Sequence, residues 1–575
     1  MTVARVLPNV TGLDKLFDYT VPDHLASAAV VGAMVRVELH GRRVGGWIVA
    51  TDPVDALPEL DLKPIAKVTG FGPTAELIDL AEWASVRWAA RRRHFLVAAS
   101  PHRAVTSIPM MHRTGRIVEP RSPSSTRILT EGDRRGGVLR LPPTSDPMPA
   151  VLSATAVGPT LVIVPSVDQV LLLAARLRRS GLTVAVLPKD WALAAGGVDV
   201  VIGSRTAAWV PFPGLAAAVL IDEHDEALQE EGSPTWHARD VLIERCRRLG
   251  SPLLVVSPCP TITALEWRQV VRPPRNRERD GWPIIDVIDR TDDDPWKRSL
   301  ITSQLITHLR DGSRTVVCVI NTTGRARMLA CRTCRELARC ERCDAAVILA
   351  DDGRLACLRC ETVRPQVCLA CQSSRFANLR PGVTRLREEL EAAANRPAVA
   401  VTGGGRERPL VAGVYVGTEA VLHRVDRADT VVFLDFDREM LAPRYRAAEQ
   451  AMGLLVRAAR LVGPRSRGGR LLIQTFMPNH DVVQAAVLAD PGRIVDGERA
   501  RRQMLGLPPF GALAEVSGTG SDEFVRSVMS HDVSIGGGDG HYVVRANDWM
   551  TLGGALDAGV RPHGSRLRIA VDPPR

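Results

Sequence analysis

Four Cys-x-x-Cys pairs lie between residues 331 and 371, and they constrain the fold more than any other feature of the sequence. Each pair can form a tight turn that directs two thiolates at one metal ion, and two such turns complete a tetrahedral zinc site. Eight cysteines therefore predict two closed sites of four thiolates each, with two Zn²⁺ per chain. Such sites leave no open position for a catalytic water, so we expect them to stabilise a segment too small to fold alone.

The four turns can be combined in three ways. The segment between the second and third turns has short apolar stretches on either side of Asp351–Gly353, which predicts a β-hairpin. A hairpin brings its two ends together, so the turns that flank it should share one ion. We therefore predict an inner cysteine set of Cys340, Cys343, Cys357 and Cys360, and an outer cysteine set of Cys331, Cys334, Cys368 and Cys371.

The composition bears on the class of protein. The formal net charge is +10, and only five of the cationic residues are lysines. Such a balance favours polyanions as partners, although an arginine-rich composition can also reflect a GC-rich genome. No apolar run is long enough to span a membrane and no secretion signal is visible, so we expect a cytoplasmic protein. Cysteines in such a chain favour metal binding over disulfides, while Cys246, Cys259 and Cys318 lie in apolar segments typical of a core.

The pattern of apolar residues divides the chain into domains. Alternating strands predict a small β-rich domain, and short apolar strands separated by helices predict parallel sheets covered on both faces. The predicted boundaries are a β-rich domain at 1–100, a linker at 101–150, a first α/β lobe at 151–290, a second lobe at 291–330 and 374–495, the double zinc insertion at 331–373, and a small α+β domain at 496–575.

The two α/β lobes resemble helicase lobes, but the phosphate-binding loop of such lobes is missing. In a working motor, a Gly-Lys-Ser/Thr sequence places a lysine on the β- and γ-phosphates. None of the five lysines follows a glycine, and the corresponding stretch at 141–159 is rich in proline, which lacks the N–H donor that cradles phosphate. Asp222 and Glu223 end an apolar strand, as expected for a Mg²⁺ ligand and a water-orienting base. We interpret them as a degenerate nucleotide site.

Several motifs together resemble the PriA family, the primosomal protein N′ of bacterial replication restart. The resemblance rests on Leu16–Tyr19, Val201–Thr206, Ile221–Asp225, Trp236–Asp240 and Leu505–Phe510, together with the order of the cysteine pairs and the terminal Val571–Pro573. It covers nearly the whole chain. It implies an N-terminal DNA-binding domain, two degenerate RecA-like helicase lobes, the inserted zinc module and a C-terminal domain.

The chain departs from the family at three further places. A winged-helix domain is replaced by the short stretch near 101–135, a Gly-Ser-Ala-Thr-Pro motif becomes Val256–Pro260, and two late arginines become Leu461 and Pro464. Members of the family are ATP-dependent DNA helicases. The departures resemble the helicase-deficient form found in actinobacteria, so we expect that this chain is not an enzyme and does not hydrolyse ATP at a useful rate.

The resemblance also implies a pocket for the 3′ end of a nascent strand. Its residues here are Phe17, Asp18, Tyr19, Gly41 and Lys63. An aromatic ring would stack on the terminal base, the carboxylate would accept a hydrogen bond from the free 3′-OH, and the lysine would meet a phosphate. Phe17 and Tyr19 share one face of a predicted strand, so an alternative is that they pack into the β-rich core, and Gly41 could serve only a turn.

The favoured hypothesis is a replication-restart factor that binds stalled or abandoned forks with a free 3′ end. It would promote primosome assembly and reloading of the replicative helicase, with the single-stranded DNA-binding protein, primosome proteins and that helicase as partners. One alternative is an active 3′-to-5′ helicase with an unconventional nucleotide site. Another is a zinc-dependent module that binds nucleic acid or protein, for which the interleaved Arg332, Arg335, Arg339, Arg342, Arg359 and Arg364 would provide a basic surface.

Overall fold

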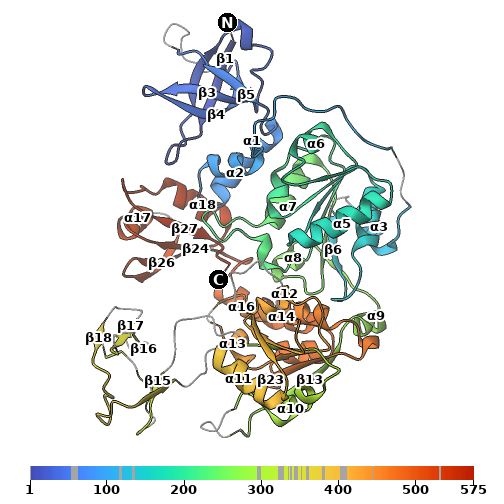
Figure 1. Ribbon diagram of the computed structural model, residues 1–575. Coiled ribbons are helices and arrows are strands. Elements are labelled where there is room, and N and C mark those ends of the chain that lie inside the picture. The colour runs from blue at the N-terminus through green and yellow to red at the C-terminus, as the bar shows by residue number, and fades with distance from the viewer. Residues whose placement is uncertain are drawn as a thin grey trace. The chain divides into compact units, whose positions relative to one another are not determined.

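A computed structural model of the chain shows a mixed α/β architecture (Figure 1). The structure describes residues 2–53, 62–115, 119–131, 136–293, 299–320, 329–334, 336, 338, 340–341, 347–350, 353–357, 362–378, 383–401, 411–442, 444–529 and 532–574. Two compact units can be separated. Unit 1 comprises Met1–Pro274, Arg444–Glu449 and Ile494–Arg575, and unit 2 comprises Arg275–Pro443 and Gln450–Arg493.

Unit 1 begins with an antiparallel sheet of five strands in the order β2-β1-β4-β3-β5. The strands are β1 (Thr2–Pro8), β2 (Phe17–Val21), β3 (Met34–Leu39), β4 (Arg42–Thr51) and β5 (Lys67–Gly70). The chain just before β5 also bonds to the opposite edge strand, because Thr20 N–H donates to Lys63 O at 3.0 Å and Ile65 N–H donates to Thr20 O at 2.9 Å. Alternate residues, among them Val6, Val35 and Val37, point into a common core. The prediction of a β-rich N-terminal domain is confirmed.

The first parallel sheet has seven strands in the order β12-β6-β11-β10-β7-β9-β8. They are β6 (Gly136–Arg140), β7 (Thr160–Ile163), β8 (Val184–Val186), β9 (Val200–Gly203), β10 (Ala217–Ile221), β11 (Leu253–Ser257) and β12 (Val270–Val271). On β10, Ala218 and Leu220 belong to one buried cluster, while Val219 and Ile221 belong to another. The sheet is therefore covered on both faces, as its continuous apolar strands predict.

Helices form the two covers of this sheet and link it to the N-terminal domain. Their bounds are α1 (Ala75–Arg87), α2 (Arg92–Ala99), α3 (Pro123–Thr130), α4 (Met148–Thr155), α5 (Val167–Arg179), α6 (Trp191–Gly196), α7 (Ala238–Leu249) and α8 (Ile262–Trp267). Strand β6 and the start of α4 lie inside the segment predicted as a linker at 101–150, and Val138 on β6 pairs with Val255 on β11. The lobe thus starts earlier than predicted. Its first strand, β6, was missed because it contains two glycines and is followed by a proline-rich segment, so its apolar residues show little periodicity.

Unit 2 contains the second parallel sheet, in the order β13-β23-β22-β14-β21-β20. The strands are β13 (Ile284–Asp289), β14 (Val316–Val319), β20 (Ala398–Val401), β21 (Val414–Gly417), β22 (Thr430–Phe433) and β23 (Arg470–Thr475). Its helices include α9 (Arg275–Asp280), α10 (Ser303–Arg310), α11 (Val383–Ala394), α12 (Val421–Arg424), α13 (Asp437–Met440) and α15 (Asp481–Val487), and α14 runs over Ala447–Val462. Because β13 pairs with β23, the second lobe includes residues before the predicted boundary at 291.

The cysteine-rich insertion consists of very short strands. Strand β15 (Leu329–Cys331) pairs with β19 (Phe376–Asn378), and β16 (Val347–Leu349), β17 (Leu355–Cys357) and β18 (Val363–Arg364) form a second small sheet. Strands β16 and β17 form the predicted hairpin, with Val347 opposite Cys357. Two or three residues per strand bury little apolar area, so such a segment needs covalent or metal links to hold its shape.

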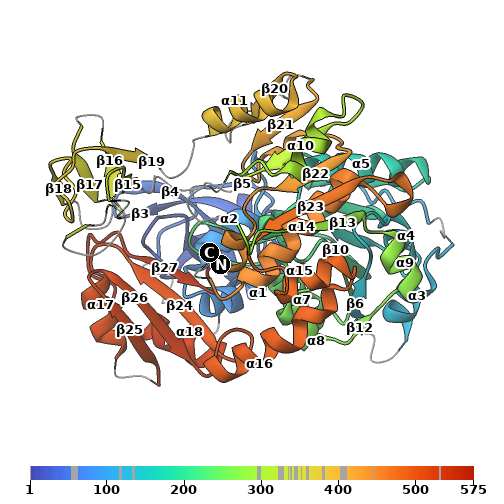
Figure 2. The same ribbon diagram turned by 90° about the horizontal axis from the view of Figure 1, so that it is seen from below.

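The C-terminal domain is an antiparallel sheet in the order β25-β26-β24-β27. Its elements are β24 (Ala512–Ser517), β25 (Ser534–Gly538), β26 (His541–Ala546) and β27 (Arg568–Val571), with α16 (Val495–Leu505), α17 (Ser521–Val528) and α18 (Trp549–Ala558). Helices α17 and α18 contact each other and both contact β24 and β26 (Figure 2). This is the predicted α+β arrangement. Among the helices that the structure describes, none combines the length and apolar character that crossing a membrane requires.

A buried arginine ties helix α1 to the first parallel sheet. Arg245 on α7 is fully buried, pairs with Glu76 on α1 at 3.0 Å, and donates hydrogen bonds to Ala208 O and Val210 O, each at 2.9 Å. Removing the arginine leaves two buried carbonyl groups and the carboxylate of Glu76, which is 25% exposed, without their donor.

We therefore expect Arg245→Met to destabilise the protein by about 3 kcal/mol, because Glu76 and two carbonyl groups lose their donor. The measurement is thermal unfolding followed by circular dichroism. Arg247→Met is the matched control, since Arg247 pairs with Glu244 on the surface of the same helix, and it should change stability by less than about 0.5 kcal/mol. Equal effects of the two substitutions would contradict the importance of the buried pair.

Candidate functional site

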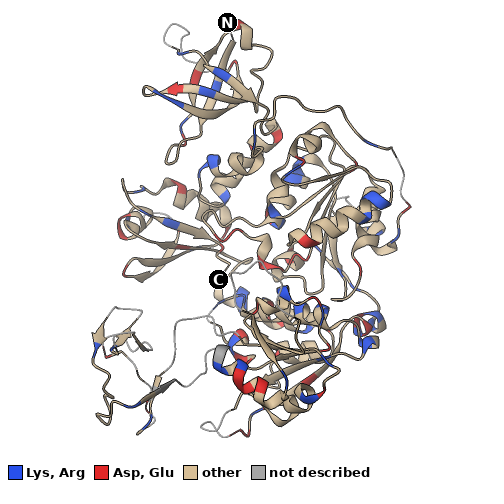
Figure 3. Ribbon diagram, in the orientation of Figure 1, with Lys and Arg blue, Asp and Glu red and all other residues tan. Residues whose placement is uncertain are grey.

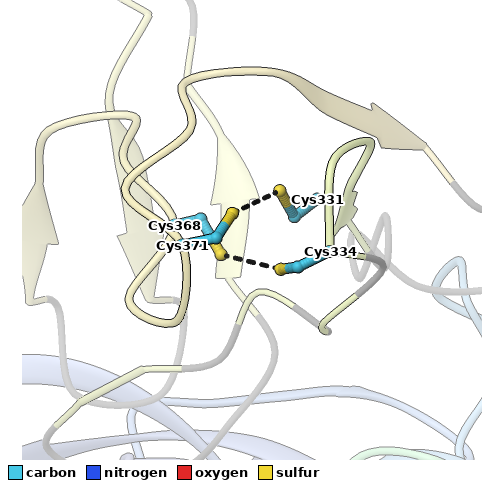
Figure 4. Close-up of side chains that lie close together, drawn as sticks. All are labelled: Cys331, Cys334, Cys368 and Cys371. Carbon is cyan, nitrogen blue, oxygen red and sulfur yellow. Dashed lines mark hydrogen bonds between the residues drawn. The ribbon is translucent and has the colours of Figure 1, made fainter.

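The outer cysteine set is gathered at one point. The pairing of β15 with β19 brings the turn that starts at Cys331 beside the loop that contains Cys368 and Cys371 (Figure 4). The Sγ atoms of Cys331 and Cys371 lie 3.5 Å apart, as do those of Cys334 and Cys368. All four sulfur atoms lie within 4.8 Å of one another. Zn–S bonds of about 2.3 Å in a tetrahedron place sulfur atoms about 3.8 Å apart, so this cluster could hold one zinc ion.

Backbone amides support the thiolate form of Cys331. Thr333 N–H donates to Cys331 Sγ at 3.4 Å. The pKa of Cys331 is lowered to about 6, chiefly by a hydrogen bond from the backbone N–H of Cys334. A thiolate is the form that binds metal. The neighbouring thiols have the opposite effect on Cys334, whose pKa they raise to about 12, so the backbone favours the thiolate at Cys331 in particular.

One backbone hydrogen bond recurs in three of the cysteine turns. The N–H of the first cysteine donates to the carbonyl oxygen five residues later, from Cys331 to Glu336, from Cys357 to Thr362 and from Cys368 to Ser373, each at 2.9 Å. The turn at Cys357 is therefore closed in the same way as the two turns of the outer set.

The inner cysteine set is described only in part. Cys340 and Cys357 are buried in one cluster with Leu329, Val347 and Leu355. Cys343 and Cys360 lie outside the described residues, so the structure gives no geometry for the predicted inner site.

The arginines interleaved with these cysteines differ in exposure. Arg332 is exposed, whereas Arg364 is 8% exposed and donates to Val367 O. The latter therefore supports the loop rather than a basic surface. The other four arginines of the predicted basic surface, Arg335, Arg339, Arg342 and Arg359, fall outside the described residues.

The residues expected at the 3′-end pocket lie on both faces of the N-terminal sheet. Tyr19 is 3% exposed in the core, and Phe17 packs against the same core with part of its ring exposed. Asp18 lies on the opposite face, directly across from Arg5 on β1. Tyr19 is thus a core residue, as the alternative in the sequence analysis has it, and Phe17 is the ring that remains accessible for stacking.

Asp18 is held by a cation that the sequence analysis did not single out. Arg5 Nε lies 2.7 Å from Asp18 Oδ1, and Arg5 Nη2 lies 3.0 Å from Asp18 Oδ2. The Asp18 side chain is only 6% exposed. This two-pronged contact fixes the plane of the carboxylate. The antiparallel register that places the two residues opposite each other is the signal that could have identified Arg5.

Lys63 and the β3–β4 turn meet at Glu38. Lys63 Nζ lies 2.7 Å from Glu38 Oε1, and Tyr19 OH donates to Glu38 O at 3.1 Å. The hydrogen bond from Lys63 lowers the pKa of Glu38, while burial raises the pKa of Tyr19. Glu38 was not among the predicted site residues, although it alternates with the buried Val35 and Val37 and therefore had to face outward.

Gly41 is required by the turn that follows Glu38. His40 and Gly41 have φ angles of 47° and 76°, and Leu39 pairs with Arg42. A two-residue hairpin turn with both φ angles positive is of type I′, which strongly favours glycine. A Cβ atom at Gly41 would meet nothing within 4 Å, so the requirement is conformational and leaves open space beside the turn.

Asp222 and Glu223 lie where the central strand β10 ends. Asp222 has a left-handed φ of 58° and accepts a hydrogen bond from Gln169 Nε2 at 3.2 Å. Glu223 is fully buried, and its carboxylate lies 2.6 Å from Arg239 Nη1 and 2.6 Å from Thr261 Oγ1. The carboxyl end of a parallel strand is where α/β folds bind ligands.

The stretch identified as the altered phosphate loop, residues 141–159, runs from β6 through α4 to β7, so it follows the first strand of the lobe rather than preceding it. Asp146 lies at the start of α4, where it accepts a hydrogen bond from Met148 N–H at 3.0 Å and from Arg176 Nη1 at 2.8 Å. The hydrogen bond from Arg176 lowers the pKa of Asp146. The strand–loop–helix order of a nucleotide-binding lobe is therefore present.

A family model described as the 3′DNA-binding domain (3′BD) of PriA matches residues 5–101. The replication restart protein PriA of Bacillus subtilis is 26% identical over 56% of this chain and 43% of its own length. The probable replication restart protein PriA of Mycobacterium tuberculosis (strain CDC 1551 / Oshkosh) is 28% identical over 89% of this chain and 85% of its own length. These matches support a PriA-type protein.

The extent of the similarity differs between relatives. The alignment with the Bacillus subtilis PriA spans less than half of that protein, whereas the alignment with the mycobacterial PriA spans most of it. Among solved structures, the DUF1998 helicase MrfA bound to DNA and AMPPNP matches 73% of this chain and 58% of that chain, with 13% identity and a TM-score of 0.35.

The expectation that the chain is not an enzyme is wrong. Its relatives are PriA proteins, and the resemblance on which the expectation rested is to a family of ATP-dependent DNA helicases, so the matches indicate a helicase-family protein. The expectation rested on the absent phosphate-loop lysine and on three further departures from the family pattern. The parallel sheet, the strand–loop–helix order and the acidic pair at the end of β10 are all present.

The cysteine cluster generates a direct prediction. Cys334→Ser should reduce the zinc content of the purified protein by about one ion per chain, because three thiolates bind zinc far more weakly than four. The measurement is elemental analysis of dialysed protein. Cys246→Ser is the matched control, since Cys246 is a buried thiol away from the cluster with its pKa raised to about 12 by burial. Unchanged zinc in the Cys334 variant would exclude the outer set as a metal site.

Proposed function

We propose that this protein acts in replication restart by binding stalled or abandoned replication forks that have a free 3′ end. It would promote primosome assembly and reloading of the replicative helicase. The observation that carries the proposal is the match of residues 5–101 to a 3′DNA-binding domain, together with the ordered carboxylate of Asp18 in that domain. A cytoplasmic location is part of the proposal, because the bacterial chromosome is replicated there.

Recognition of the DNA end would depend on Asp18. A carboxylate can accept several hydrogen bonds, and Arg5 occupies two of its lone-pair directions while fixing its plane. A 3′-OH would donate a hydrogen bond to this oriented carboxylate. A 3′-phosphate, or the phosphodiester of an uninterrupted strand, has no such donor and would bring negative charge towards Asp18 and Glu38. The site would therefore select a free 3′-OH.

Lys63 would bind the phosphate that precedes the terminal nucleotide. Its ammonium group now contacts Glu38, and 56% of its side chain and 49% of that of Glu38 are exposed. An exposed ion pair of this kind is weak, so a phosphate can take the place of the carboxylate at little cost. Phe17 would provide the stacking surface, and Gly41 the open space beside the turn.

A protein that binds forks in replication restart would need protein partners at the fork. We propose that the single-stranded DNA-binding protein, primosome proteins and the replicative helicase are recruited to the bound fork, and that the zinc module contributes part of the contact surface. The β-rich domain would hold the DNA end while these other parts of the chain engage the partners.

We also propose that the inner cysteine set binds a second zinc ion. The backbone bond from Cys357 to Thr362 repeats the one that closes both turns of the outer set, and Cys340 and Cys357 are buried together in one cluster. The hairpin of β16 and β17 gives the reason for pairing the flanking turns.

End recognition can be tested with synthetic forks whose nascent strand ends in either a 3′-OH or a 3′-phosphate. The unaltered protein should bind the 3′-OH fork at least about tenfold more tightly, a difference of about 1.4 kcal/mol. Asp18→Asn and Asp18→Ala should lose this preference, since both remove the carboxylate charge. Fluorescence anisotropy gives the affinities.

Asp79→Ala is the control, because Asp79 is a carboxylate on α1 of the same unit, away from the pocket residues, and it should leave the preference unchanged. The proposal fails if the unaltered protein binds both forks equally, or if both Asp18 variants keep the preference while remaining folded by circular dichroism.

The second metal site has its own test. We expect about two zinc ions per chain in the unaltered protein, about one in Cys357→Ser, and none when this change is combined with Cys334→Ser. Elemental analysis provides the counts. A protein with a single zinc ion that survives Cys357→Ser would show that the inner set does not bind metal.

A further inference from the structure

Two arginine-rich segments that are far apart in the sequence meet on one edge of the second parallel sheet. Helix α9 leads into β13, and the short 3₁₀ helix η5 (Arg465–Arg467) leads into β23. These two strands are parallel neighbours, with Ile284 opposite Arg470 and Ile284 N–H donating to Gly469 O at 3.3 Å. The segments that precede parallel neighbours must lie at the same edge of a sheet, and α9 indeed contacts η5.

The side chains turn this edge into a cationic surface. Arg277 and Arg279 are exposed on α9, while Glu278 between them points inward and is fully buried. Arg465 and Arg467 are on η5, where both are half-buried. We call Arg277, Arg279, Arg465 and Arg467 the arginine edge. Figure 3 shows Lys and Arg on the α9 part of this edge.

These four arginines lack the carboxylate partners that other arginines of the same sheet edge have. Ahead of β14, Arg314 pairs with Asp311 at 2.9 Å, and ahead of β22, Arg427 lies 3.9 Å from Asp429. Within the part of the chain that the structure describes, no ion pair joins the arginine edge to an acidic side chain. Arg465 Nε and Arg467 Nη2 are buried and have no acceptor.

The chemistry of the edge favours the backbone of duplex DNA. Guanidinium groups without partners suit phosphate oxygens, which can accept two parallel hydrogen bonds. Single-stranded nucleic acid is normally bound with stacking aromatic side chains. The edge offers none among its described residues, because Trp282, which follows α9, is fully buried. Arginines without an accessible aromatic ring or an apolar groove contact phosphates and read no bases.

We propose that the arginine edge of unit 2 is a binding surface for the phosphate backbone of duplex DNA. It is separate from the 3′-end site and goes beyond the proposed function, since it needs no DNA end. Its contribution is sequence-independent and sensitive to salt, because each arginine that meets a phosphate releases condensed counterions.

The test uses a covalently closed dumbbell duplex, which has no 3′ end. The variant carries Arg277→Gln, Arg279→Gln, Arg465→Gln and Arg467→Gln. It should bind the dumbbell at least about tenfold more weakly at low salt, and the slope of log affinity against log salt concentration should become shallower by about 2 to 4, at about 0.9 per phosphate contact. Anisotropy at several salt concentrations measures both quantities for the full-length protein.

The matched control carries Arg314→Gln and Arg427→Gln, which remove charge from paired arginines on the same sheet edge. It should keep the dumbbell affinity and slope of the unaltered protein to within about twofold. Unchanged zinc content and circular dichroism of the fourfold variant exclude unfolding as the cause.

Three results would overturn the proposal: no binding of the dumbbell by the unaltered protein, unchanged affinity and slope in the fourfold variant, or an equal loss in the control. An acidic protein segment as the true occupant would produce the second of these results. The 3′-OH preference of the fourfold variant should persist, so failure of this surface and failure of the 3′-end proposal give different outcomes.

Discussion

Parallel strand pairing is the constraint on which the rest of the structure depends. It sends every segment that follows a strand to one edge of the sheet and every segment that precedes a strand to the other. In unit 1, this rule places Asp222 and Glu223 at the carboxyl end of the central strand β10. In unit 2, it places α9 and η5 at the edge where strands begin, because α9 precedes β13 and η5 precedes β23. The buried acidic pair in unit 1 and the arginine edge in unit 2 are therefore products of the same kind of topology.

The cysteine-rich insertion depends on a different interaction. Its strands are two or three residues long, which is too little for a hydrophobic core to stabilise. The insertion relies on the convergence of thiolates from turns that repeat one backbone hydrogen bond. A zinc ion held by the outer set would stabilise this segment, whereas the parallel sheets are stabilised by burial of apolar side chains.

Much of the fold could be predicted because its signals are local. Continuous apolar strands indicated the parallel sheets, the spacing of cysteines indicated the outer set, and the sequence around Asp351–Gly353 indicated the hairpin. The start of the first lobe was missed, because the glycines and prolines around β6 weaken the periodicity on which the prediction rested. The expectation of a non-enzyme was wrong because it gave the absent lysine and the other departures from the family pattern more weight than the overall similarity to PriA proteins.

The candidate site was harder to predict, because its electrostatics depend on register. Asp18 could be singled out by resemblance, but the cation that fixes it, Arg5, is set by which residues face each other across β1 and β2. Lys63 could be predicted to meet a phosphate, yet its present partner, Glu38, is revealed only when the chain before β5 closes the sheet. Tyr19 shares a sequence motif with Phe17, but it lies deeper in the β-rich core and therefore serves packing.

One side chain near the acidic pair connects the end of strand β10 to helix α8. Thr261 Oγ1 accepts a hydrogen bond from Ala264 N–H at 3.3 Å at the start of α8, and also lies 2.6 Å from Glu223 Oε1. In the same turn, Ile262 N–H donates to Glu449 Oε1 at 2.6 Å. Thr261 N–H also donates to Glu223 Oε2 at 3.1 Å, so two hydrogen bonds tie the Glu223 carboxylate to the residue that caps α8. The side chain of one threonine thus joins the residue that follows the central strand β10 to the first turn of helix α8.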